Sequence, residues 1–144
     1  GDFAGALEVA RSIEDASERS MLLSSVVDAQ LASGDFAGAL EVARSVEDAS
    51  DRSRALSSVV DAQLASGDFA GALEVARSEG ESDRSMLLSS VADALVASGD
   101  VAGALEVVSE ALEVARSVED LYERFVALSE ILKSLPKEMM QSNP

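Results

Sequence analysis

Three aspartates recur along the chain at a nearly fixed spacing, because Asp28, Asp61 and Asp93 are 33 and 32 residues apart. The chain has no His and no Cys, so the commonest acid–base group, the thiol nucleophile and the usual zinc ligands are missing. Carboxylates alone bind basic side chains or Ca²⁺, and no twelve-residue Ca²⁺ loop is present. We therefore expect contacts with Lys or Arg of a partner, or solvated side chains copied with a repeat. We expect no metal and no cofactor.

Paired serines accompany these aspartates at residues 24–25, 57–58 and 89–90. A serine nucleophile needs a neighbouring base, and the chain offers no His and no nearby Lys for that role. We interpret the serines as small residues that allow helices to pack closely. The sequence predicts no catalytic residues and a protein that is not an enzyme.

The charge balance narrows the choice of partner. Among 144 residues, 11 are basic and 27 acidic, which gives a net charge of −16. Such a surface repels nucleic acid and anionic membranes, while 47% hydrophobic residues favour a folded chain. No apolar run of about 18 residues and no signal sequence is visible, so we expect a soluble, cytoplasmic protein. Because Gly1 begins inside a repeat, we expect the chain to be part of a longer protein.

An internal repeat determines the expected fold. The string GDFAGALEVARS stands at residues 1–12, 34–45 and 67–78, and the variant GDVAGALEVVSE at 99–110. A fixed period of this size is typical of stacked structural repeats. We predict one helical repeat domain over 1–135, with repeat starts near 1, 34, 67 and 99, a final capping helix at 120–135 and a C-terminal tail at 136–144.

Each period contains two helical patterns. Around Leu23, Val26 and Val27, apolar residues recur at spacings of three and four. Gly34 suits the left-handed position past a helix end, and Asp35 can cap the following helix. No segment alternates with a period of two. The sequence thus predicts an all-α fold with eight helices, near 2–13, 17–32, 35–46, 50–65, 68–78, 82–97, 100–118 and 120–135.

Three features of the repeat have open interpretations. Gly38 and its copies lie inside helices, at a cost of about 1 kcal/mol each relative to Ala, and either a close backbone approach or simple copying would explain them. Residues 104–117 duplicate seven residues, which predicts a helix that projects past its neighbours. Glu74 and Arg77, like Glu8–Arg11, Glu41–Arg44 and Glu113–Arg116, have the spacing of weak ion pairs on a helix.

The stretch Gly34-Asp35-Phe36 with Ala39-Leu40 resembles the turn and second helix of tetratricopeptide (TPR) repeats. The likeness covers nearly the whole chain, although the family's first-helix pattern is replaced by smaller residues, its later aromatic by Ala43, and its closing proline is absent. It implies a right-handed α-α superhelix, a solenoid of stacked antiparallel helix pairs.

The TPR resemblance also implies that the first helix of each pair lines a concave groove that binds peptides. The groove positions are Met21, Ser24, Asp28 and Leu31, then Arg54, Ser57, Asp61 and Leu64, then Met86, Ser89, Asp93 and Val96, with Lys133 at the equivalent place in the last helix. We expect Lys133 to end the row of aspartates by pairing with Asp93.

Two functions remain open. The first is a non-catalytic scaffold that binds a protein or a basic peptide in the groove or on the long helix. The alternative is a structural module that forms homo-oligomers through the ends of the solenoid, because an uncovered terminal repeat exposes apolar surface. On this second hypothesis Phe3 and Leu7 of the first helix belong to the interface.

Overall fold

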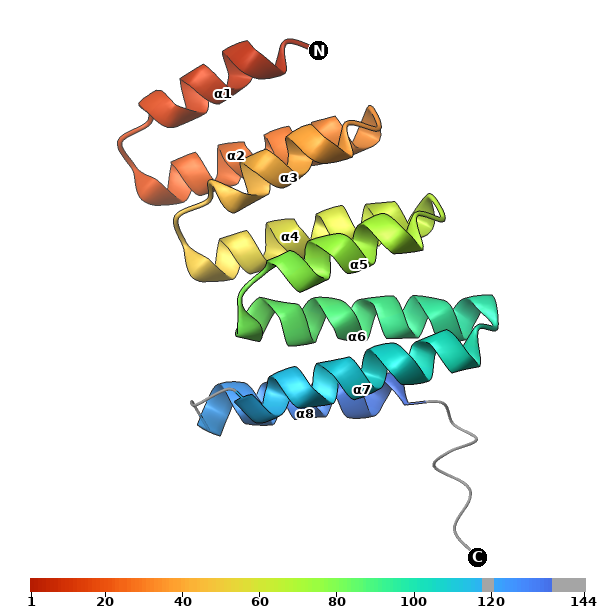
Figure 1. The fold of residues 1–144 in the computed structure, drawn as a ribbon. Helices are drawn as coiled ribbons and strands as arrows, with labels where there is room; N and C mark the ends of the chain where they lie inside the picture. Colours follow the sequence, from red (N-terminus) through yellow and green to blue (C-terminus); the bar gives the residue numbers. More distant parts are fainter. Residues whose placement is uncertain (118–120, 136–144) are drawn as a thin grey trace, which may run out of the picture. The chain divides into compact units, whose positions relative to one another are not determined.

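The computed structural model is all-helical over the residues that it describes, 1–117 and 121–135 (Figure 1). The helices agree with the predicted ones within two residues at each end, and the all-α class is confirmed. They are α1 (Phe3–Ser12), α2 (Ala16–Ala32), α3 (Phe36–Arg44), α4 (Ala49–Ala65), α5 (Phe69–Ser78), α6 (Glu81–Ser98), α7 (Val101–Ser117) and α8 (Leu121–Ser134). The predicted tail at 136–144 lies outside the described residues.

The chain divides into two compact units, of which the first is Gly1–Gln63 and the second begins at Leu64. In the first unit α2 packs against both α1 and α3. In the second unit α6 packs against α5, α7 and α8, and α7 also packs against α8. The helices alternate along the chain between two kinds. We call the even-numbered ones, α2, α4, α6 and α8, the A helices, and the odd-numbered ones, α1, α3, α5 and α7, the B helices.

The turn from an A helix to a B helix has the geometry that the sequence predicts. Gly34 has a φ of 81°, and its N–H donates to the Leu31 carbonyl at 3.0 Å while that of Asp35 donates to Gln30 at 2.9 Å. This is the Schellman arrangement, in which glycine alone avoids strain. The Asp35 carboxylate then accepts the Gly38 N–H at 3.0 Å and caps α3.

The glycine inside α3 has a local cause that differs from both interpretations of the sequence. A Cβ at Gly38 would overlap the capping carboxylate of Asp35 and the side-chain amide of Gln30. That amide also donates to Asp35 at 3.2 Å. Gly5 and Gly103 stand in the same relation to their own capping aspartates. The glycine therefore makes room for the capping aspartate and, at Gly38, also for the side-chain amide of Gln30 on α2.

The seven-residue duplication lengthens a helix without exposing it. α7 has 17 residues against 10 in α5, an extension of about two turns. Ala111 and Ala115 in this extension are fully buried, because α6 and α8 both pack against α7. The expectation that this helix projects past its neighbours is wrong, and it is not available as a free binding arm.

An arginine near the start of every A helix donates to the chain just after the preceding B helix. Arg52 Nη1 donates to the carbonyls of Val46 and Glu47 at 3.1 and 3.3 Å. Arg19, Arg84 and Arg124 make equivalent bonds to the carbonyls of Ile13, Glu79 and Arg116. The guanidinium thereby satisfies carbonyls that the helix leaves without partners. The sequence analysis did not single out these arginines.

One ion pair departs from the predicted pattern. Arg77 binds Glu110 of α7 at 2.8 Å, rather than Glu74 of its own helix. The mutual hydrogen bond lowers the pKa of Glu110 and raises the pKa of Arg77. Glu110 belongs to the duplicated segment, so the duplication supplies the partner.

Candidate partner-binding surface

The predicted groove residues of the first unit converge partly around one small cavity. Ser24 and Asp28 of α2 and Arg54 of α4 line this cavity, which measures about 90 Å³, together with Val27, Ala55 and Ser58. The apolar stripe of α2 is buried, which leaves Asp28 exposed on the opposite side of the helix. Two neighbouring A helices thus present an acidic and a basic side chain to the same hollow.

Arg54 is held on its own helix. Its Nη1 atom donates to Asp51 at 3.1 Å, and the side chain remains largely exposed. Met21, one turn before the serine pair of α2, is among the most exposed apolar side chains of the described residues. Both residues are exposed to solvent.

Asp61 differs from the other acidic groups in its environment. Partial burial raises the pKa of its carboxyl group above the usual value of 3.8, because burial disfavours the charged form. No hydrogen bond or ion pair reaches this carboxylate from any residue that the structure describes. Ser57, one turn earlier, is half-buried. A cation placed beside Asp61 would restore the lost solvation.

The predicted surface residues of the second unit differ in their exposure. Asp93 is exposed and Met86 is half-buried on α6. Ser89, however, is buried: its hydroxyl donates to Ser85 at 2.9 Å, and its carbonyl accepts the hydroxyl of Ser134 from α8. Because α8 covers this part of α6, Ser89 is not a groove residue, and that prediction is wrong.

The expected pair between Lys133 and Asp93 does not form. Lys133 Nζ instead binds Glu130 at 2.6 Å, one turn earlier on α8. A partner on the same helix is available at lower entropic cost than one on another helix. Asp93 is left without an ion-pair partner among the residues that the structure describes.

Nine of the twelve aspartates fall into two classes. Six of them cap helices by accepting a backbone N–H at 2.9–3.0 Å, and these are Asp2, Asp15, Asp35, Asp48, Asp68 and Asp100. Asp28, Asp61 and Asp93 make no hydrogen bond or ion pair within the described ranges. The capping aspartates have a structural role, because each one accepts a backbone N–H at the start of a helix. The A-helix class has no structural role that the contacts reveal.

Four of the six paired serines donate their hydroxyls within their own helices, and Ser89 is one of them. Ser24, Ser25 and Ser58 each donate to the carbonyl four residues earlier, at 3.0–3.2 Å. This local bond is the common arrangement for serine inside a helix. No group of three or more acidic side chains that could hold a metal ion occurs within the described part of the chain. None of its helices is both long enough and apolar enough to cross a bilayer.

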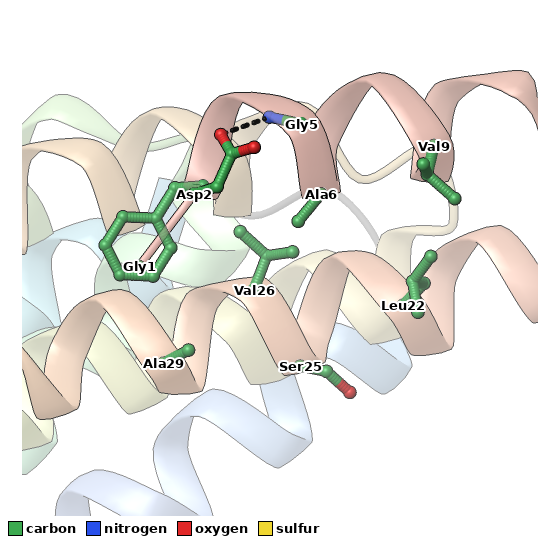
Figure 2. Close-up of a pocket in the computed structure, with 10 residues that line it drawn as sticks. Gly1, Asp2, Gly5, Ala6, Val9, Leu22, Ser25, Val26 and Ala29 are labelled. Atoms are coloured by element: carbon green, nitrogen blue, oxygen red, sulfur yellow. Dashed lines mark hydrogen bonds between the residues drawn. The ribbon is translucent and has the colours of Figure 1, made fainter.

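A second hollow lies at the start of the chain, and Figure 2 shows it in close-up. Ala6 and Val9 point from α1 toward Leu22 and Val26 of α2, across an open apolar pocket of about 500 Å³. Phe3 also lines this pocket, but Leu7 does not. The exposed apolar residue of α1 is Val9.

We compared the chain with known protein families, curated proteins and solved structures. No family model and no curated protein matches the chain. Among solved structures, the crystal structure of Ton1535 from Thermococcus onnurineus NA1 is similar, with 21% sequence identity and a TM-score of 0.47. The match covers 91% of this chain and 42% of that one, so the chain spans less than half of that protein. The TPR resemblance therefore stays a prediction from the sequence.

Proposed function

We propose that the chain is a non-catalytic, cytoplasmic protein-interaction module whose A helices bind a basic segment of a partner protein. The observation that supports this most directly is the contrast between the aspartates. Six aspartates at helix starts are engaged in capping, whereas Asp28, Asp61 and Asp93 have no cationic or hydrogen-bonding partner among the described residues. A carboxylate that is partly desolvated and uncompensated, like that of Asp61, gains most from an incoming Lys or Arg.

The net charge of the whole chain also favours binding of a basic segment. A net charge of −16 attracts a basic ligand over long distances and raises its rate of association. This long-range term does not depend on which acidic residues are present, so it cannot by itself identify the binding surface. The surface is identified only if the three A-helix aspartates contribute more than other acids of equal exposure.

A charge-matched comparison tests this proposal. A fluorescent peptide rich in Lys and Arg is titrated with the wild-type chain, with the triple variant Asp28→Asn, Asp61→Asn, Asp93→Asn, and with the control Glu41→Gln, Glu74→Gln, Glu106→Gln. The control residues are exposed and occupy equivalent places on three B helices. Both variants lose the same charge and therefore the same long-range attraction.

We expect the aspartate variant to bind the peptide about tenfold or more weakly than the control, because each lost contact is worth roughly 0.5 kcal/mol or more. Binding by the wild type should also weaken as salt is added, since the contacts are exposed ion pairs. Equal affinities for the two variants would show that only net charge matters, and the proposed surface would be wrong.

A further inference from the structure

We propose that the small cavity between α2 and α4, both in the first unit, accepts one aliphatic side chain of leucine size from the basic segment of the partner. This inference rests on the proposed function, because it adds a second contact to the surface that contains Asp28. It makes the site selective for a basic residue beside an aliphatic one, rather than for positive charge alone.

The cavity lies where α4 departs from the sequence of the other A helices. The stretch SMLLSS stands at residues 20–25 of α2 and again at residues 85–90 of α6, whereas α4 has SRALSS at residues 53–58. Ala55 therefore stands where α2 has Leu22 and α6 has Leu87. Leu87 is fully buried. An A helix thus holds a leucine side chain at this place, and α4 lacks the branched end of it.

The buried part of the cavity lining is apolar. Val27 of α2 and Ala55 of α4 both line the cavity and are 1% and 5% exposed. The hydroxyls of Ser24 and Ser58 already donate to carbonyls of their own helices, at 3.0 and 3.2 Å. Water in such a hollow finds few hydrogen-bond partners, so its displacement by an apolar group favours binding.

The volume of the cavity limits the side chain that can enter. A cavity of about 150 Å³ is the size that holds benzene inside a protein, and this one measures about 90 Å³. An aromatic ring is therefore too large. A branched aliphatic group matches both the volume and the leucine that α2 and α6 carry at the equivalent place.

The charged residues at the cavity determine what lies beside that aliphatic group. Arg54 and Asp28 line the cavity and are exposed. The positive charge of Arg54 is offset by Asp51, which its Nη1 atom contacts at 3.1 Å. The Asp28 carboxylate has no such partner among the described residues. A Lys or Arg that follows or precedes the aliphatic residue can pair with Asp28, since successive residues of an extended chain lie only about 3.3 Å apart along its axis.

Three fluorescent peptides of identical charge test the proposal. Each has the form Lys-Lys-X-Lys-Lys, in which X is Leu, Ala or Trp, so long-range attraction to the acidic chain is the same for all. Fluorescence polarisation measures their affinity for the full wild-type chain and for Ala55→Leu, which fills the cavity. Ala55→Val fills it in part and serves as a second, milder variant. Ala65→Leu, at an exposed position of the same helix, is the matched control, and circular dichroism checks folding.

We expect the wild type and the control to bind the Leu peptide about tenfold more tightly than the Ala peptide, the usual effect of burying a branched apolar end. The Trp peptide should bind more weakly than the Leu peptide, because its ring does not fit. Ala55→Leu should bind the Leu and Ala peptides equally, and Ala55→Val should show an intermediate difference.

Two results would overturn the pocket and leave the aspartate surface standing. One is equal affinity of the wild type for the Leu and Ala peptides, or tighter binding of the Trp peptide, which would indicate general apolar contact. The other is a preference for Leu that persists in Ala55→Leu and Ala55→Val. Conversely, a preference for Leu that depends on Ala55, together with equal affinities of the aspartate and glutamate triple variants, would refute the aspartate surface alone. A wild-type chain that binds none of the peptides at about 1 mM would refute both proposals.

Discussion

Arg52 provides the sharpest test of how the repeats are held together. Replacing it by Met keeps most of the aliphatic stem but removes the two hydrogen bonds to the carbonyls of Val46 and Glu47, at 3.1 and 3.3 Å. Hydrogen bonds from a charged donor contribute about 1.5–3 kcal/mol each when well formed. Since one is long and the site is only half-buried, we expect a loss of about 1–2 kcal/mol in the free energy of unfolding for the pair.

Arg54→Met is the matched control for that variant. Arg54 lies on the same helix two residues later and makes an exposed pair with Asp51, worth about 0.3 kcal/mol. Both variants remove one positive charge from a chain of net charge −16, so their long-range electrostatic effects match. The difference between them isolates the bonds to the carbonyls.

Urea and thermal unfolding, followed by circular dichroism, measure both variants. For a chain of this size we expect Arg52→Met to lower the melting temperature by about 3–6 °C and Arg54→Met by about 1 °C. If the two variants are equally stable, the arginine bonds contribute nothing beyond charge. The structural role assigned to Arg19, Arg84 and Arg124 would then be withdrawn as well.

Three further substitutions test other contacts by unfolding measurements. Gly34→Ala should cost about 1–2 kcal/mol because φ is 81° there, whereas Gly80→Ala, with φ of −64°, should change stability by under about 0.5 kcal/mol; equal effects would exclude backbone strain as the cause. Glu110→Gln should destabilise the chain at neutral pH, and the difference should disappear as pH falls below 4.5, since the folded-state pKa is lowered; a difference that persists in acid would rule out the ion pair. Asp61→Asn should be slightly more stable than wild type at pH 7 and equal to it below pH 3.8, because burial raises the pKa of Asp61. A stabilisation that is independent of pH would contradict this.

Most of the fold was predictable because its determinants are local. Gly34 and Asp35 end one helix and start the next through their own backbone preferences, and the apolar spacing around Val26 and Val27 requires a helix. The repeat then extends one correct assignment to every copy. The same locality explains why the helix ends agree so closely.

The errors concern side chains whose environment depends on a different helix. Ser89 has the same sequence neighbours as Ser24, but α8 covers Ser89. Arg77 has Glu74 at the predicted spacing and binds Glu110 instead, because α7 brings a better-placed carboxylate. The role of Gly38 required knowing where the Asp35 carboxylate lies. Duplication copies the residue, whereas its contacts depend on which helix follows.

In a repeat chain the same residue occurs in several copies with different neighbouring helices. Comparing the copies therefore shows which properties come from the residue and which come from its surroundings. Ser24 and Ser89 share residue type and helix position, so the burial of Ser89 follows from the packing of α8 against α6. The A-helix aspartates allow no such comparison, because Asp28, Asp61 and Asp93 are all exposed, and only charge-matched variants can separate their local effect from the field of the chain. Contacts between carboxylates and a basic peptide also weaken as salt is added. A salt series on one preparation therefore tests whether ion pairs hold the peptide before any variant is made.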